Sequence, residues 1–260
     1  MSFDELVLSS DQQHAVDEID RFVLDPDRNE LVLGVLAGTG KTTIVGRLLD
    51  RMPRVVAPTA KACAVLRRKG VSAKTIHSTI YDFAGISHED GQRPKMEFDD
   101  KSGVSLRGLV ICDEASMVTT QVANSLYSCV FPHGGKILWV GDHGQLPPVG
   151  DDPRLMHDPD VRLERIHRQA EGSPILKVAH SARGGMRLSD AAAYDAVPGI
   201  VRGTTVSSDA SLSELLDAER PDVVLVARND TRRRVNRLAY ELLAQTNDAV
   251  VADEFPKLFV

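Results

Sequence analysis

The sequence lacks the features of secreted, zinc-binding and membrane-embedded proteins. Only three of the 260 residues are cysteine, at positions 63, 112 and 129, and no two have Cys-x-x-Cys spacing. This scarcity argues against a zinc site or a disulfide framework and favours a reducing compartment. No apolar run approaches the roughly 18 residues that cross a bilayer, and the acidic start lacks the basic and apolar segments of a secretory signal. We therefore expect a cytoplasmic protein, or one of the host cytoplasm if its source is a virus, without a membrane partner.

An excess of positive charge is also absent, since the formal net charge is −6. Any contact with nucleic acid must therefore come from a local basic surface. Hydrophobic residues make up 42% and charged residues 26% of the chain, which excludes general disorder. The length suits one large domain or two small ones.

Short apolar strands alternate with helical stretches, which predicts an α/β fold with a mainly parallel sheet. The first helix opens at Ser9 and Gln12, which have capping-box spacing, and stops at residues 25–27. The predicted strands are Leu31–Leu36, Arg54–Ala57, Leu109–Cys112, Lys136–Val140 and Val223–Val226. The predicted later helices are Lys41–Asp50, Lys61–Lys69, Thr119–Tyr127 and Thr231–Leu243.

Two interruptions suggest how the chain is organised. Residues 84–107 are polar and turn-rich, and Lys95–Phe98 alternates like one arm of a hairpin, so we interpret this segment as an insertion. Residues 150–153 read as a linker. We predict a first domain over residues 1–152 and a second over residues 153–260.

The strongest local signal is an apolar strand that runs into a glycine-containing turn and then a Lys-Thr pair at a helix start. This context is typical of a phosphate-binding loop, in which Lys41 reaches the β- and γ-phosphates of ATP and Thr42 ligates Mg²⁺. The pattern departs from Gly-x4-Gly-Lys, because Val35 stands where the first glycine belongs and Gly34 comes one place early. The alternative is an ordinary strand-turn-helix with a chance Gly-Lys-Thr. The predicted nucleotide-binding residues of this loop are Ala37, Gly38, Thr39, Gly40, Lys41, Thr42 and Thr43.

A second apolar strand ends in Asp113 and Glu114. Ligands bind at the carboxyl edge of open parallel sheets, so these carboxylates belong near the phosphate loop. We expect Asp113 to hold magnesium and Glu114 to polarise the attacking water. The alternative is a solvent-facing strand end.

Together these motifs resemble those of superfamily 1 helicases of the RecD-like and Dda-like branch. The segment Val-Gly-Asp-His-Gly-Gln-Leu-Pro-Pro-Val at residues 140–149 resembles motif III, and residues 163–169 resemble motif IV. The resemblance implies a RecA-like P-loop NTPase domain, a small 1B element at the insertion, and a partial second RecA-like domain. It further implies that Gln12 reads adenine, that Gln145 senses the γ-phosphate, and that Arg168 reaches it from the second domain. The implied catalytic residues are Lys41, Asp113, Glu114, Gln145 and Arg168.

The same resemblance implies binding of single-stranded DNA. Segments 56–62 and 75–78 correspond to the family's DNA-contacting motifs, and the implied DNA-binding residues are Pro58, Thr59, Lys61 and His77. The resemblance also implies that the insertion is a strand-separating pin. Phe98 would stack on a base there, or would be a buried aromatic residue of the hairpin.

Structural roles remain open for each of these residues. Gln12 could serve only its helix cap, Thr59 could bond backbone, His77 could cap a helix, and Arg168 could belong to a solvated basic face. The same applies to five arginines that would contact DNA phosphates or lie on a solvated face: Arg228, Arg232, Arg233, Arg234 and Arg237.

No segment resembles the family's motifs V and VI. From the motifs that are present, the first hypothesis is an ATP- and Mg²⁺-dependent DNA helicase of the 5′-to-3′ type, or a DNA-stimulated ATPase. The second is a truncated module that binds ATP and single-stranded DNA but does not unwind alone. Expected partners are single-stranded DNA, replication or recombination proteins, and a chain that supplies the missing motifs. An unrelated P-loop kinase or ATPase is a third, weaker hypothesis.

Overall fold

The computed structural model describes residues 8–36, 39–87, 95–100, 103–164, 184–185, 208–220, 223–224, 226 and 228–246. The chain divides into two compact units, residues 1–190 and 191–260. Each unit is described separately. Among the helices of this described part, none is both long enough and apolar enough to cross a membrane.

The first unit is built on a six-stranded sheet whose neighbouring strands are all parallel. The strand order is β3-β2-β6-β7-β1-β8. This arrangement confirms the predicted α/β fold with a parallel sheet. The strands are β1 (Glu30–Val35), β2 (Arg54–Ala57), β3 (Ala73–Thr75), β6 (Leu109–Asp113), β7 (Lys136–Gly141) and β8 (Val161–Leu163).

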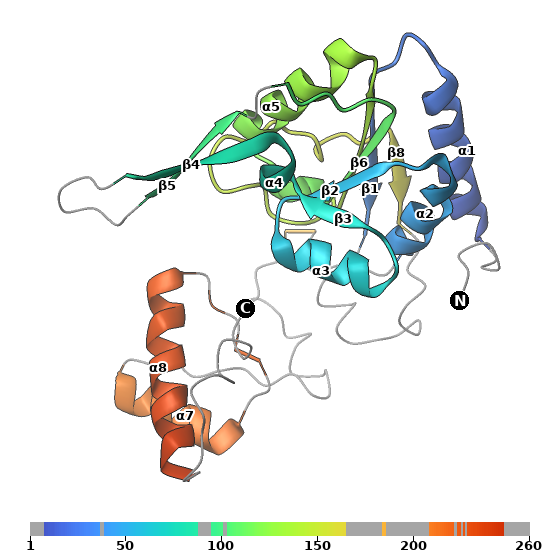
Figure 1. The fold of residues 1–260 in the computed structure, drawn as a ribbon. Coiled ribbons are helices and arrows are strands. Elements are labelled where there is room, and N and C mark those ends of the chain that lie inside the picture. Colours follow the sequence, from blue (N-terminus) through green and yellow to red (C-terminus); the bar gives the residue numbers. More distant parts are fainter. Residues whose placement is uncertain are drawn as a thin grey trace. The chain divides into compact units, whose positions relative to one another are not determined.

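Helices cover both faces of this sheet (Figure 1). Because both faces are buried, the strands have continuous apolar runs rather than alternating ones. Side chains of one face pack with α1 (Ser10–Leu24), α2 (Lys41–Arg47) and α3 (Ala60–Arg68). Side chains of the other pack with α4 (Ile76–Ile80) and α5 (Thr120–Val130).

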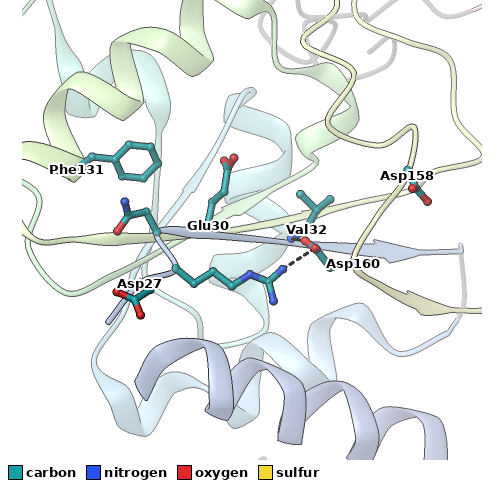
Figure 2. A pocket seen from close by; sticks show the side chains of 8 residues that line it. Asp27, Glu30, Val32, Phe131, Asp158 and Asp160 are labelled. Atoms are coloured by element: carbon teal, nitrogen blue, oxygen red, sulfur yellow. Dashed lines mark hydrogen bonds and ion pairs between the residues drawn. The ribbon is translucent and has the colours of Figure 1, made fainter. Parts of the chain in front are cut away.

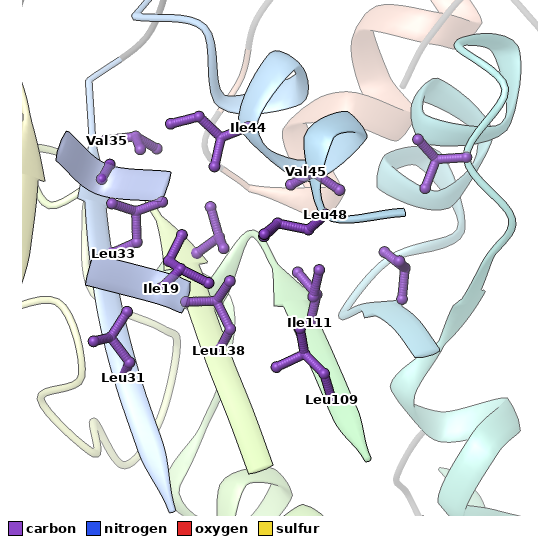
Figure 3. Packing of buried hydrophobic residues seen from close by; sticks show 14 of the residues in the cluster. Ile19, Leu31, Leu33, Val35, Ile44, Val45, Leu48, Leu109, Ile111 and Leu138 are labelled. Atoms are coloured by element: carbon purple, nitrogen blue, oxygen red, sulfur yellow. The ribbon is translucent and has the colours of Figure 1, made fainter. Parts of the chain in front are cut away.

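The alternation along β6 shows how one strand supplies two cores. Leu109 and Ile111 belong to the cluster that includes α1 and α2, where Ile19 lies, as Figure 3 shows. Val110 and Cys112 belong to the opposite cluster, which also contains the fully buried Trp139. The sheet is thereby fixed from both sides, which holds the carboxyl ends of its strands in place.

The first helix is fixed at both ends by polar groups. Ser9 and Gln12 form the predicted capping box at its start. At its carboxyl end, the Lys136 ammonium donates to the carbonyl of Phe22 in the last turn and to those of Asp25 and Arg28 after the helix. It also lies 5.0 Å from the centre of the Phe22 ring. Lys136 therefore anchors α1 to β7.

The predicted insertion contains an antiparallel hairpin. Strand β4 (Tyr81–Ser87) pairs with β5 (Lys95–Asp100), with an irregularity between Phe83 and Gly85. The hairpin projects away from the main sheet in Figure 1. Its first strand begins three residues before the predicted start at residue 84, because Tyr81 continues directly from α4. Short 3₁₀ helices in the described part of the first unit are η2 (Leu49–Arg51), η3 (Ala115–Met117) and η4 (Phe131–His133).

In the second unit the described elements are α7 (Asp209–Glu219) and α8 (Asn229–Thr246). The predicted helix Thr231–Leu243 lies within α8 and is confirmed. The predicted strand Val223–Val226 is wrong at its described positions, since residues 223, 224 and 226 are not in a strand and Val223 is exposed. The division between the units also differs from the predicted boundary at residue 152, because β8 pairs with β1 in the first sheet.

Candidate active site

The loop between β1 and α2 turns on Gly40. This residue precedes α2 with a φ of 96°, a left-handed conformation that favours glycine. The preceding residue, Thr39, is buried, and its Oγ1 donates to the carbonyl of Leu36 over 2.9 Å. The predicted loop residues Ala37 and Gly38 lie outside the described part of the chain, as does the side chain of Thr42.

Gly34 is not a displaced glycine of this loop. It lies within β1, where an added Cβ would meet Pro159 Cγ at 2.5 Å and His143 Nδ1 at 2.9 Å. The space of the missing side chain lets the segment before β8 and the segment after β7 approach β1. Val35, which stands at the usual first-glycine position, instead closes the strand as a buried core residue.

Lys41 contacts both acidic residues that end β6. Its Nζ lies 3.0 Å from Oδ1 of Asp113 and 2.6 Å from Oε1 of Glu114. Burial alone would lower the pKa of Lys41, but attraction to the two carboxylates outweighs it and raises the pKa. Burial raises the pKa of Asp113, against the opposing effect of Lys41. The structure thus brings together three of the predicted catalytic residues as one partly buried cluster of charges.

Glu114 holds an unusual backbone conformation at this point. Its φ is 56° and its ψ is 41°, and its N–H donates to Oδ1 of Asp113 over 2.9 Å. A left-handed non-glycine residue stores roughly 1–3 kcal/mol of strain, and such residues concentrate at functional sites. The sharp turn after Asp113 directs the Glu114 carboxylate toward Lys41 rather than along the strand.

The segment after β7 lies against the turn that follows β6. The carboxylate of Asp142 accepts the N–H of Gly144 over 2.8 Å, which shapes the turn that carries Gln145. The Oγ of Ser116 donates to Oε1 of Gln145 over 3.3 Å. An added Cβ on Gly141 would lie 2.9 Å from the backbone nitrogen of Ser116, so the two segments approach closely only because of that glycine.

The contact between Ser116 and Gln145 was not predicted from the sequence. Ser116 is buried at 5% exposure and lies two residues after Glu114 in the chain. A serine two residues after an acidic pair at a strand end was the available signal. Its partner could not be identified without the fold.

Gln12 lies beside the loop. Its Nε2 donates to the carbonyl of Thr39 over 2.9 Å, while its Oε1 accepts the N–H of Ser9 over 3.0 Å. The helix-cap role is therefore confirmed, and it coexists with a contact to the loop.

The predicted DNA-contacting residues follow β2 and β3 at the same edge of the sheet as Lys41 and Asp113. Thr59 caps α3 by accepting the N–H of Ala62 over 3.1 Å, so its hydroxyl does bond backbone. Lys61 is exposed in the first turn of α3, and Pro58 is partly exposed. The ring of His77 lies 5.3 Å from that of Tyr81, whereas Thr75, not His77, caps α4.

Other predicted residues fall outside what the structure describes. Arg168 is one of these, as is the side chain of Phe98. In the second unit, three of the five arginines around α8 form ion pairs with acidic residues: Arg228 with Asp230, Arg234 with Asp209, and Arg237 with Asp209 and Glu241. Arg232 and Arg233 are exposed.

A cavity of about 570 Å³ lies at the opposite edge of the sheet, at the start of β1 (Figure 2). Three of its ionic side chains, those of Arg28, Glu30 and Asp160, are engaged structurally. Asp160 pairs with Arg28 and accepts the N–H of Val32, and Glu30 accepts from Tyr127 and Trp139. Its residues hold β1, α5 and the segment before β8 together, and none belongs to the Lys41 cluster.

The chain is similar to known proteins in sequence and in fold. A family model described as an AAA domain matches residues 7–205. The ATP-dependent RecD2 DNA helicase of Deinococcus radiodurans is 32% identical over 155 residues, which make up 55% of this chain but 20% of that protein. The structure of the Pif1 helicase from Bacteroides in complex with ADP-AlF3 and ssDNA aligns over 94% of this chain and 59% of its own, with a TM-score of 0.59 and 21% identity. That of the Pif1 helicase from Candida albicans aligns over 88% and 60%, with a TM-score of 0.52 and 19% identity.

These findings confirm the predicted resemblance to RecD-like helicases of superfamily 1B and the RecA-like α/β fold. The chain spans only a fifth of the RecD2 relative's length and about three fifths of the Pif1 chains. Because the family model covers well over half of the 260 residues, the chain belongs to the AAA domain family.

Proposed function

We propose that the chain hydrolyses ATP at the carboxyl edge of the first-unit sheet and couples this reaction to single-stranded DNA. The observation that carries the proposal is the contact of Lys41 with both Asp113 and Glu114, directly after the left-handed turn at Gly40. A lysine after such a turn reaches the phosphates of a nucleotide, and the carboxylates at the neighbouring strand end face the same point.

The acidic residues fit a magnesium ion. Mg²⁺ binds through one or two carboxylates together with phosphate oxygens, and Asp113 offers a buried carboxylate whose ionised form is disfavoured by its surroundings. A cation there would offset that burial. Asp113 would hold the ion with Thr42, and the ion would supply charge neutralisation at the phosphates.

The remaining residues suit the chemical step. Glu114 accepts the proton of the attacking water as the oxygen bonds to the γ-phosphorus and ADP departs. In the resting structure its carboxylate is bound to Lys41, so bound phosphate competes for that ammonium and releases Glu114. Gln145, turned by Asp142 and contacted by Ser116, lies on the adjacent strand end and is proposed to sense the γ-phosphate. Arg168 is proposed to act from the following segment.

DNA binding is proposed at the ends of β2 and β3, where Pro58, Thr59, Lys61 and His77 lie. The Pif1 structure in complex with ssDNA supports this choice of ligand, and the RecD2 relative supports a helicase. The proposed direction of movement is 5′ to 3′, after the RecD-like branch. The cytoplasm is the proposed compartment, since the three cysteines are free.

Steady-state ATP hydrolysis with Mg²⁺, in the presence and absence of single-stranded DNA, tests the function. We expect stimulation by DNA, and loss of hydrolysis in Lys41→Ala. Lys74→Ala, which removes an exposed lysine of β3, is the matched control and should retain hydrolysis. Equal turnover by wild type and Lys41→Ala would contradict the assignment. Binding of both ligands without hydrolysis would instead support a binding module.

Strand displacement is tested separately. Duplexes with a 5′ tail and with a 3′ tail, compared at equal enzyme concentration, report both unwinding and its direction. Preference for the 3′ tail would contradict the proposed direction while leaving the ATPase assignment intact.

A further inference from the structure

The amide of Gln12 is engaged at both ends. Its Oε1 accepts the backbone N–H of Ser9, and its Nε2 donates to the carbonyl of Thr39. The side chain is buried, with 7% of the residue exposed. A primary amide offers one acceptor oxygen and two N–H donors, so this arrangement uses its oxygen for the helix and one N–H for the loop.

The fit between Gln12 and the loop depends on a glycine. An added Cβ on Gly40 would lie 2.2 Å from Nε2 of Gln12, closer than real Cβ contacts occur. The same glycine has a φ of 96°. This position therefore needs glycine both for its left-handed backbone conformation and for the space that the Gln12 amide occupies. The amide of Gln12 therefore lies against the peptide that joins Thr39 to Gly40, immediately before Lys41.

Holding that peptide has a geometric consequence. In a trans peptide the carbonyl and the following N–H point in opposite directions. Fixing the Thr39 carbonyl on Gln12 therefore directs the Gly40 N–H in the opposite direction within the same peptide plane. A loop whose backbone donors are set before a ligand arrives binds phosphate without first having to order itself.

We infer that Gln12 is a positioning residue for the phosphate-binding loop, which strengthens the binding of phosphate groups whether or not a base is attached to them. This inference rests on the proposed ATP site but differs from the role of reading adenine. A base reader affects only ligands that carry the base. A residue that sets the loop backbone affects inorganic polyphosphate to the same degree as ATP.

The variant Gln12→Glu isolates the contact to the loop. Glutamate at the third helical position still accepts the Ser9 N–H in a capping box, has nearly the same size, and lacks the N–H that reaches Thr39. Gln12→Met removes the same donor without adding charge, which controls for repulsion between a carboxylate and phosphate. Ser9→Ala weakens the helix cap but keeps the Gln12 donor, and so controls for loosening of α1.

The experiment measures dissociation constants of inorganic tripolyphosphate and of ATP, each with Mg²⁺, by calorimetry. We expect Gln12→Glu and Gln12→Met to weaken both ligands by a similar factor, roughly fivefold to tenfold, as for loss of one buried hydrogen bond. Ser9→Ala should stay within about twofold of wild type, because the bond to Thr39 survives. Thermal unfolding of each variant confirms that it is folded at the temperature used.

Two outcomes overturn the inference. If both Gln12 variants bind tripolyphosphate like wild type while ATP affinity falls, Gln12 acts on the base alone. If Ser9→Ala weakens tripolyphosphate as much as the Gln12 variants, the effect belongs to the helix cap. Lys41→Ala separates the proposed function from this inference, since equal tripolyphosphate binding by wild type and Lys41→Ala would reject the phosphate site itself.

Discussion

The Nζ of Lys41 lies 2.6 Å from Oε1 of Glu114, and this pair joins the start of α2 to the end of β6 across 73 positions of sequence. The contact places the proposed phosphate-binding lysine and the proposed base in one cluster before any ligand is bound. It also means that Glu114 has a structural partner at rest, so its two roles must be separated by experiment.

Glu114→Gln separates catalysis from binding. The amide keeps the size of the side chain and can still contact Lys41 through its oxygen, but it cannot accept a proton from water. We expect ATP affinity within a few fold of wild type and hydrolysis lower by a factor on the order of 100. Single-turnover hydrolysis and nucleotide titration measure the two quantities. Loss of affinity with an unchanged rate at saturating ATP would assign Glu114 a structural role.

Lys136 provides a contrasting lysine, because its ammonium contacts carbonyls of α1 and the following turn rather than carboxylates at the site. Lys136→Met keeps most of the aliphatic chain but leaves those carbonyls without their charged donor. We expect the unfolding free energy to fall by about 2–3 kcal/mol, as for loss of charged hydrogen bonds. Denaturant unfolding measures the change.

The same variant should bind Mg²⁺-ATP normally at a temperature where it is folded, since Lys136 lies outside the Lys41 cluster. Reduced nucleotide affinity without loss of stability would show that α1 transmits the effect to the loop through Gln12.

The strands could be predicted because both faces of the sheet are buried, which produces uninterrupted apolar runs. Strand β2 has the predicted bounds, Arg54–Ala57. Strand β8 was not predicted, because it has three residues and an exposed Arg162 at its centre, and only its pairing with β1 identifies it. The apolar run at residues 223–226 shows the opposite case, in which composition alone suggested a strand.

The candidate site likewise has features that could be predicted from the sequence and features that could not. Lys41 and Asp113 could be predicted to converge, because parallel strands carry their carboxyl ends to one edge. The bonds from Gln12 to Thr39 and from Ser116 to Gln145 could not, since they depend on side-chain conformation and on close approach at Gly40 and Gly141. A glycine in the sequence does not indicate which residue packs into the space left by its missing Cβ.

Tyr127 gives a test of pH dependence. Its hydroxyl donates to Glu30 over 2.9 Å, and burial together with the nearby carboxylate raises its pKa above the usual 10.0. A raised acid pKa means that the folded state holds the proton more tightly than the unfolded chain. The stabilisation is therefore complete below the unfolded pKa, near 10.0, and is lost as pH rises above it.

We expect Tyr127→Phe to be less stable than wild type at pH 7, by about 1–3 kcal/mol, since Glu30 loses a donor. The difference should narrow as the pH rises above about 10. Denaturant unfolding of both proteins across this range measures it. A difference that stays constant would contradict the raised pKa of Tyr127.

Ser116 is expected to influence the rate more than the binding of ATP. Its hydroxyl contacts the amide oxygen of Gln145, which leaves the amide N–H groups to face a γ-phosphate. Ser116→Ala removes this restraint with little change in volume. We expect kcat to fall roughly threefold to tenfold, as for loss of one hydrogen bond, with KM nearly unchanged.

Gln145→Ala supplies the control for this effect. If Ser116 acts through Gln145, adding Ser116→Ala to Gln145→Ala should produce no further loss of kcat. Additive losses in the double variant would show that Ser116 affects the rate by another route.

Lys61 is the sharpest test of the DNA surface, because α3 carries lysines at both of its ends. Lys61 lies in the first turn, at the carboxyl edge of the sheet, whereas Lys69 follows the last residue of the helix, about 12 Å away along its axis. If the carboxyl edge binds the phosphates of single-stranded DNA, removing one contact should lower the slope of log K against log salt by about 0.7. Lys61→Ala should show this change and a uniform loss of affinity across sequences, while Lys69→Ala should match wild type. Fluorescence anisotropy with a labelled oligonucleotide at several salt concentrations measures both variants. An unchanged slope in Lys61→Ala, or an equal change in Lys69→Ala, would move the DNA path away from this edge of the sheet.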